Sequence, residues 1–262
     1  MTNKKIKNAW FSCEKHAPNA SLRLFCFSYA GGNAMMFRPW QEFFWPKIEV
    51  CPLQIPGHGT RLGEAPFTRM RPLVQAMVGP MMEFLDRPFA FFGHSMGAIL
   101  AFELAHALRS ECGLTPSHLF VSGRPAPHRP LPPPLHNLPR PQLLEELRRL
   151  KGTPDEVLQH EELLEVLIPL LRADFEVIET YEYVSRPKLA CPITAFGGVE
   201  DLRVSRTDLE GWAEHGSGGF SLRMLNGDHF FIHKLQAQLL QMVSEEIQPL
   251  VGLNNQQLCM GS

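Results

Sequence analysis

A serine stands between two closely spaced glycines in the pentapeptide GHSMG, which spans residues 93–97. The apolar run at 89–92 predicts a strand before it, and apolar residues at helical spacing predict a helix from Met96 onward. A serine on such a sharp strand-to-helix turn takes a strained backbone conformation that lifts its hydroxyl clear of the sheet. Glycine suits both flanking positions because a Cβ there would collide with the neighbouring helix or strand. The context therefore indicates a nucleophile, Ser95, rather than an ordinary glycine-rich turn.

A serine hydroxyl needs a base to accept its proton and a carboxylate to orient that base. In this architecture the expected chain order is serine, acid and histidine, with the last two on loops that follow later strands. Asp201 follows the apolar run at 192–196, and His229 follows the run at 220–225. Both therefore lie at the carboxyl ends of predicted strands, where open α/β sheets place their sites. We assign Asp201 as the acid and His229 as the base.

Other acids and histidines of the chain compete for these two roles. Glu200 is an immediate neighbour of Asp201. Because the chain has eleven histidines, a single histidine carries little information. His94 is expected to point away from the adjacent serine, while His215 and His233 fall before and after the loop that should carry the base. The more distant candidates for the acid are Asp174 and Asp228.

Negative charge that develops on a substrate carbonyl needs hydrogen-bond donors, an arrangement called an oxyanion hole. The helix that begins after the serine points its N-terminal amides at the reacting oxygen, so the backbone N–H of Met96 is one expected donor. The second should come from the loop at 28–33, where two adjacent glycines let the backbone approach a ligand closely. We expect this donor to be the N–H of Ala30. The sequence has no metal-binding motif and no glycine-rich phosphate or dinucleotide loop, so no metal or cofactor is expected.

Strand and helix patterns alternate along the chain and must position these residues. The strand patterns are nearly continuously apolar, which suits strands that are covered on both faces. Their alternation predicts an α/β fold with a mostly parallel sheet and helices on both faces. Strands are predicted at 22–29, 48–53, 89–92, 119–122, 192–196 and 220–225, and helices at 70–85, 96–108 and 233–250.

A different pattern interrupts this alternation between residues 125 and 183. It opens with eight prolines at 125–141, which could be a linker between two domains or a break inside one. Strand patterns with catalytic partners resume after residue 192, so the chain on both sides belongs to one core. We therefore expect a single domain with a core of residues 20–125 and 184–250, an inserted helical lid at 126–183 and a loose tail at 252–262. The lid's short helices are predicted around 143–150, 155–158, 161–171 and 173–181.

Composition excludes several classes of protein. The 262 residues carry 25 cationic and 27 acidic side chains, a formal net charge of −2, so non-specific nucleic-acid binding is not expected. No apolar run approaches the ~18 residues that span a bilayer, and the N-terminus lacks the apolar core of a secretory signal. The six cysteines form no CxxC pair, which favours reduced, buried thiols and a cytoplasmic protein.

The chain resembles the type II thioesterases, the stand-alone editing hydrolases that accompany nonribosomal peptide and polyketide synthetases. The resemblance covers about residues 22–245, in family order, and several of its motifs are more specific than the general hydrolase signature. Two positions depart from the family pattern: Lys151 replaces a frequent glycine, and Leu202 replaces the usual proline after the acid. The matching stretches are 27–32 (FSYAGG), 37–40 (FRPW), 56–57 (PG), 91–98 (FFGHSMGA), 122–127 (SGRPAP), 152–154 (GTP), 171–175 (LRADF), 179–181 (ETY) and 227–230 (GDHF).

The resemblance implies an α/β-hydrolase fold with an inserted lid, and hydrolysis of aberrant or stalled acyl groups on carrier proteins. It places the nucleophile, acid and base on Ser95, Asp201 and His229, and the oxyanion donors on Ala30 and Met96. The only prosthetic group that it implies is the 4′-phosphopantetheine arm, which belongs to the carrier-protein substrate. It also implies a role in antibiotic biosynthesis, and we expect a monomer.

The insert carries its charge unevenly. Residues 124–151 hold six cations and two acids, a net of +4, whereas residues 152–182 hold nine acids and one cation, a net of −8. Solvated helix faces explain most such runs. Because carrier proteins are acidic, the basic stretch is nevertheless a candidate docking surface, with Arg148 and Arg149 as its candidate contacts.

Three other functions share these sequence features. A carboxylesterase or lipase would use the same triad on free esters. An acyltransferase would pass the acyl group to an acceptor other than water, since a lid that excludes water can redirect the acyl-enzyme. A catalytically silent protein could keep the hydrolase shape only to dock on a synthetase, although an intact serine, acid and histidine in order argue against it.

Overall fold

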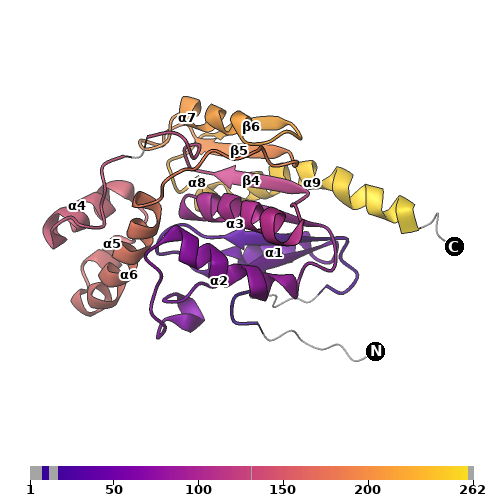
Figure 1. Cartoon of the computed structure of the whole chain (residues 1–262). Coiled ribbons are helices and arrows are strands. Elements are labelled where there is room, and N and C mark those ends of the chain that lie inside the picture. The colour runs from indigo at the N-terminus through magenta and orange to yellow at the C-terminus, as the bar shows by residue number, and fades with distance from the viewer. Residues whose placement is uncertain (1–7, 12–16, 131, 259–262) are drawn as a thin grey trace.

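Six parallel strands form the centre of the computed structural model, which describes residues 8–11, 17–130 and 132–258, with the side chains of 252–258 excepted (Figure 1). The order across the sheet is β2-β1-β3-β4-β5-β6, and every neighbouring pair is parallel. This confirms the predicted mostly parallel sheet. The strands are β1 (Leu22–Phe27), β2 (Ile48–Pro52), β3 (Phe89–His94), β4 (His118–Ser122), β5 (Ile193–Gly198) and β6 (Phe220–Leu225).

Side chains of the central strands alternate between two separate apolar cores. Phe25 and Phe91 face a core that includes helices α2 (Met70–Met82) and α3 (Met96–Cys112). Leu24 and its neighbour on β3, Ala90, face the opposite core, which includes helices α1 (Arg38–Phe44) and α9 (Gln236–Leu258). Both faces of the sheet are therefore covered, which is why the strand sequences are apolar at consecutive positions.

The insert lies between β4 and β5, which are themselves neighbours in the sheet. It contains helices α4 (Arg140–Leu150), α5 (Asp155–Leu158) and α6 (Glu161–Glu179), gathered at one end of the sheet (Figure 1). The prediction of two helices at 161–171 and 173–181 was wrong, since α6 is continuous and contains Pro169. The helix continues because its buried face runs on without a break. That face consists of Leu164, Ile168, Leu171, Phe175 and Ile178.

The C-terminal helix also differs from its prediction. The pattern at 233–250 corresponds to two helices, α8 (Phe231–Lys234) and α9, which meet at Leu235. Helix α9 continues through Leu258, so most of the stretch at 252–262 is helical rather than loose, and 259–262 lie outside the described residues. A single glycine such as Gly252 costs only about 1 kcal/mol in a helix and does not end one by itself.

Shorter elements complete the fold, and the sequence patterns did not predict them. They are helix α7 (Arg206–Glu210) and three 3₁₀ turns at Ala34–Phe37, Gly59–Arg61 and Gly211–Glu214. In the part of the chain that the structure describes, no helix is both long and apolar enough to cross a membrane. The cysteines in that part form no disulfide: Cys26, Cys51 and Cys191 are buried and Cys112 is partly exposed.

Candidate active site

Ser95 occupies a tight turn between β3 and α3. Its φ of 55° and ψ of −113° are a backbone conformation that residues with a side chain rarely adopt. A Cβ at Gly93 would lie 2.1 Å from the carbonyl oxygen of Gly97, and one at Gly97 would lie 2.1 Å from that of Phe27. Both glycines are therefore required by close backbone approach, and the turn has the geometry expected of a nucleophile elbow.

Asp201 and His229 meet at the carboxyl ends of β5 and β6. His229 Nδ1 lies 2.6 Å from Asp201 Oδ2. The other carboxylate oxygen of Asp201 accepts hydrogen bonds from the backbone N–H groups of Arg203 at 2.9 Å and Val204 at 3.2 Å. The Asp201 side chain is fully buried, so the carboxylate is held in one orientation and fixes the imidazole in turn.

The other acids considered from the sequence have different partners. Glu200 is exposed, and Asp228 forms an ion pair with Lys234 at 2.7 Å. Asp174 is buried on α6 and bonds to His58 and Gly31. The structure therefore brings only Asp201, of the four candidates, to His229 within the described residues.

The histidines near the site also differ in their partners. His94 is completely buried, its Nδ1 lies 2.8 Å from Ser122 Oγ, and its ring centroid is 5.3 Å from that of His229. Burial, together with the charges of His229 and His233, holds the pKa of His94 well below its ordinary value, so this ring is neutral. His233 Nε2 lies 2.8 Å from the hydroxyl of Tyr29, and His215 pairs with His128. His229 is thus the histidine that shares a cavity with Ser95.

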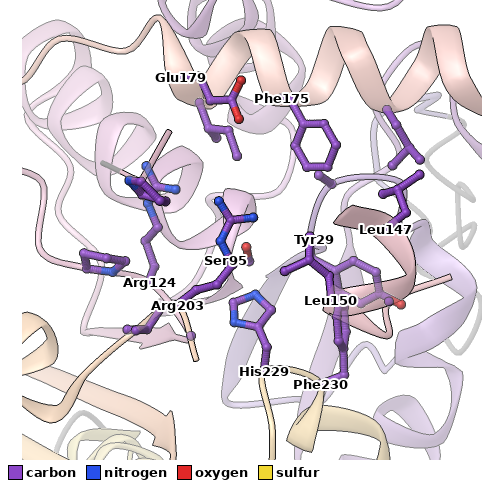
Figure 2. Close-up of a pocket in the computed structure, with 18 of the residues that line it drawn as sticks. Tyr29, Ser95, Arg124, Leu147, Leu150, Phe175, Glu179, Arg203, His229 and Phe230 are labelled. Atoms are coloured by element: carbon purple, nitrogen blue, oxygen red, sulfur yellow. The ribbon is translucent and has the colours of Figure 1, made fainter. Parts of the chain in front are cut away.

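Helices of the insert cover the cavity that Ser95 and His229 share. Figure 2 shows Ser95 and His229 on one side of it and Phe175 and Glu179 reaching in from helix α6. No hydrogen bond joins Ser95 Oγ to His229 among the described residues, which is common before substrate is bound. The largest apolar side chains of the lining, mostly supplied by the insert, are Tyr29, Leu147, Leu150, Leu171, Phe175, Ile178 and Phe230.

Two arginines that the sequence patterns did not single out also line the cavity. Arg124 is buried, and no partner for its Nε lies in the described part of the chain. Burial, reinforced by the charge of Arg203, lowers the pKa of Arg124 to about 10, and burial likewise lowers the pKa of Arg203. Both remain cations at neutral pH and bring positive charge to this end of the cavity, which Glu179 also lines. The available signal was the position of Arg124 two residues beyond the end of β4, at the edge where such folds place their sites.

The two expected oxyanion donors are both available for a ligand. Met96 is the first residue of α3, and the first N–H groups of a helix have no acceptor within it. The N–H of Ala30 has no acceptor among the described residues, and Ala30 lines the cavity. The next N–H along the chain, that of Gly31, donates to Asp174 Oδ2 at 2.7 Å.

The comparisons with known proteins agree with this geometry. The family model described as a thioesterase domain matches residues 22–247. This chain belongs to the thioesterase family. It is a hydrolase of thioesters, and its sheet is that of the α/β-hydrolase fold.

Individual relatives of this thioesterase come from antibiotic and related biosynthetic pathways. The linear gramicidin dehydrogenase LgrE of Brevibacillus parabrevis is 43% identical, over 93% of this chain and 94% of that protein. The solved structure of the thioesterase RedJ, from the prodiginine pathway of Streptomyces coelicolor, is 40% identical with a TM-score of 0.83, over 88% of this chain and 87% of that one. The type II thioesterase BorB, from the borrelidin biosynthetic cluster, is 34% identical with a TM-score of 0.84, over 92% and 99%. These matches confirm the resemblance to type II thioesterases.

The two docking candidates differ in their surroundings on α4 of the thioesterase. Arg149 donates to Glu146 from its Nε at 3.0 Å and from a terminal nitrogen at 2.6 Å, so its charge is largely balanced within the helix. Arg148 is exposed and has no ion pair in the part of the chain that the structure describes. Of the two, Arg148 is the charge that is available to a partner.

Proposed function

We propose that this thioesterase is a stand-alone editing enzyme that hydrolyses aberrant or stalled acyl groups from the phosphopantetheine arm of carrier proteins. The arrangement of Ser95, His229 and Asp201 at an apolar cavity carries the proposal, because this is the machinery of acyl transfer from a thioester to water. The relatives support the pathway: BorB is a type II thioesterase of a biosynthetic cluster, and this chain matches nearly its whole length. Nonribosomal peptide or polyketide synthesis is therefore the setting in which we place the enzyme.

The reaction proceeds in two steps. His229 Nε2 takes the proton of the Ser95 hydroxyl as its oxygen attacks the thioester carbonyl, while Asp201 holds Nδ1–H and stabilises the imidazolium. The tetrahedral oxyanion accepts hydrogen bonds from the N–H groups of Ala30 and Met96. The C–S bond then breaks, and the proton on His229 passes to the departing pantetheine sulfur.

The acyl-enzyme that remains is an ester of Ser95. Water enters the vacated position, gives a proton to His229 and attacks the ester carbonyl through the same oxyanion geometry. Breaking of the C–Oγ bond returns the proton to Ser95 and releases the free acid. The apolar lining from α4 and α6 holds the acyl chain during both steps, which gives the insert a role in acyl selection.

We propose carrier proteins as the partners of this enzyme. We also propose that it acts in the cytoplasm and as a monomer. The acidic surfaces of carrier proteins complement the basic stretch at 124–151, with Arg148 as the most available cation and Arg149 as a secondary one. The phosphopantetheine arm arrives with the carrier, so the proposed reaction needs no cofactor that belongs to the enzyme.

A comparison of three substrates with one acyl group tests the proposal. We expect kcat/KM to be highest for the acyl group on a carrier protein, lower for acyl-pantetheine and lowest for its nitrophenyl ester. Ser95→Ala should abolish hydrolysis of all three and labelling by a fluorophosphonate. A preference for the nitrophenyl ester would support a carboxylesterase or lipase instead.

The products distinguish the remaining alternatives. Free acid in amounts equal to the released thiol supports hydrolysis, whereas an acylated acceptor in its place would indicate an acyltransferase. Because LgrE is named a dehydrogenase, nicotinamide absorbance is followed in the same reactions. Oxidation of reduced nicotinamide with release of an aldehyde would overturn the proposal, and so would a wild-type enzyme that neither reacts with the probe nor turns over.

A further inference from the structure

The loop at residues 28–33, called the oxyanion loop below, follows β1, and a residue of the insert holds it in place. Asp174, on helix α6, is 2% exposed, and its Oδ2 accepts a hydrogen bond from the backbone N–H of Gly31 at 2.7 Å. Gly31 follows Ala30, which lines the cavity and whose own N–H has no acceptor among the described residues. The peptide units of Ala30 and Gly31 are joined only through the φ and ψ of Ala30, so a contact that anchors the Gly31 N–H restricts the directions that the Ala30 N–H can take.

A buried histidine holds Asp174 in place. His58 Nε2 lies 2.9 Å from the same Oδ2 atom, and His58 Nδ1 lies 3.1 Å from the carbonyl oxygen of Pro56. Both neighbours are acceptors, and a neutral imidazole has only one N–H to donate. His58 is therefore an imidazolium that donates from both ring nitrogens, paired with the Asp174 carboxylate.

The electrostatics of the pair agree with this protonation state. Burial by itself would lower the pKa of His58, but the hydrogen bond to Asp174, the charge of that carboxylate and the Pro56 carbonyl together raise it above its ordinary value. The imidazolium and the carboxylate are 1% and 2% exposed, so neither is solvated by water and each depends on the other.

Apolar side chains of α6 also pack against the loops that contain Gly31 and Gly57. A Cβ at Gly31 would lie 2.6 Å from Leu171 Cδ2, and one at Gly57 would lie 3.2 Å from Leu170 Cδ1. Gly31 also has a φ of 77°, which side-chain-bearing residues rarely adopt. The loop is therefore enclosed between α6 and the sheet, with the Asp174–His58 pair as its polar attachment.

We propose that Asp174 and His58 are positioning residues that hold the Ala30 N–H in the oxyanion hole and so couple the insert to the reaction. The proposal rests on the proposed function, because it requires the Ala30 N–H to stabilise the oxyanion. The pair touches neither the nucleophile nor the reacting atoms. Its effect is on the transition state and not on binding of the acyl chain, so it should change kcat and leave KM unaltered.

Asp174→Asn is the primary test, since it keeps the size of the side chain and removes its charge. Loss of a whole oxyanion donor typically reduces kcat by about 10²–10³. A displaced donor should cost less, so we expect kcat on acyl-pantetheine to fall by about 10- to 100-fold with KM within about twofold. Labelling of Ser95 by a fluorophosphonate should slow by a similar factor, because its phosphoryl oxygen uses the same donors.

The matched control is Glu103→Gln on helix α3. Glu103 is a carboxylate of the same kind whose side chain is 14% exposed; it accepts a hydrogen bond from the Tyr181 hydroxyl at 2.7 Å but does not line the Ser95 cavity. Its kcat and labelling rate should stay within about twofold of wild type. Urea unfolding of both variants shows that the compared proteins are folded.

Three results would overturn the inference: wild-type rates in Asp174→Asn, a raised KM with unchanged kcat, or an equal loss in Glu103→Gln. If Asp174→Asn does not fold, His58→Gln takes its place, because it removes the cation and leaves the carboxylate bonded to Gly31. We then expect about a three- to tenfold fall in kcat, and a wild-type kcat would reject the coupling. A wild-type enzyme without turnover or labelling would instead reject the proposed function, and the inference with it.

Discussion

The cavity has a proton-transfer side, formed by Asp201 and His229, and an oxyanion side, formed by the Ala30–Gly31 loop. Different parts of the chain hold the two sides. Asp201 and His229 lie on loops after neighbouring strands, and backbone N–H groups two and three residues beyond Asp201 fix its carboxylate. The Ala30–Gly31 loop is instead fixed by Asp174, which lies 143 residues further along the chain in the insert. The loops at the end of the sheet therefore orient acid and base by themselves, whereas the oxyanion loop depends on a second structural unit.

The largest expected effect is on the proton-transfer side. Asp201→Asn keeps the shape of the side chain but removes the charge that stabilises the His229 imidazolium, so kcat should fall by about 10⁴. Glu200→Gln is the control, since Glu200 is adjacent in sequence and exposed. The measurement is kcat on acyl-pantetheine for both variants. A loss below tenfold in Asp201→Asn, or an equal loss in Glu200→Gln, would show that the acid is misassigned.

The oxyanion side should respond to a single added methyl group. Gly31→Ala places a Cβ where it meets Leu171 and forces alanine into a left-handed conformation, so the loop must shift. We expect kcat to fall by about 10²-fold, near the effect of losing one oxyanion donor. Gly63→Ala adds the same methyl group in open space and should leave kcat unchanged. Equal kcat in the two variants would contradict the tight enclosure of the loop.

Histidine charge offers a way to compare the sheet with the His58–Asp174 pair through stability. Burial lowers the pKa of His118, in the sheet, to about 4, so this ring is neutral in the folded protein. The unfolded chain takes up a proton below pH 6.5 and the folded chain does not, so the free energy of unfolding falls as the pH falls from about 6.5 towards 4. His58 has a raised pKa and acts in the opposite direction: its contribution is complete below pH 6.5 and is lost as the pH rises through its folded value.

Urea unfolding at several pH values measures this contrast. His118→Gln should remove about 2 kcal/mol of the stability loss between pH 7 and pH 5. His160→Gln, at an exposed position of the insert, is the matched control. An unaltered pH dependence in His118→Gln would mean that this histidine is not buried in its neutral form.

The smallest expected effect is on the surface of the insert. Reversing the charges of Arg148 and Arg149 together should raise KM for an acyl-carrier protein by about three- to fivefold, because exposed charges act mainly on encounter with a partner. KM for acyl-pantetheine should not change, since that substrate has no protein surface. A similar rise for both substrates would place the arginines in binding of the arm or acyl chain and not in docking.

The sequence predicted the elements whose signals are local. Most strands of the sheet carry nearly continuous apolar runs, and Ser95, Asp201 and His229 each follow a predicted strand, so their meeting at one edge of the sheet could be expected. The sequence pattern predicted two helices where α6 is continuous, because the buried face that unites them depends on tertiary contacts.

Interactions between distant segments escaped sequence reasoning for a physical reason. Asp174 was considered only as an alternative acid, because its partners Gly31 and His58 are not linked to it by any local pattern. Arg124 had a positional signal at the end of β4, but its burial without an ion-pair partner in the described part of the chain follows only from packing of the insert. Local patterns identify the catalytic candidates, and the folded insert reveals what supports them.

A structure of the enzyme with a phosphonate bound to Ser95 tests the central claim most directly, namely that the sheet and the insert together build one oxyanion site. The phosphoryl oxygen marks the place that the substrate oxyanion takes during acyl transfer. We predict that this oxygen lies about 2.7–3.1 Å from the backbone nitrogens of both Ala30 and Met96, with the Gly31 N–H still bonded to Asp174. A phosphoryl oxygen that points away from Ala30, or a Gly31 N–H that has left Asp174 in the adduct, would contradict the account.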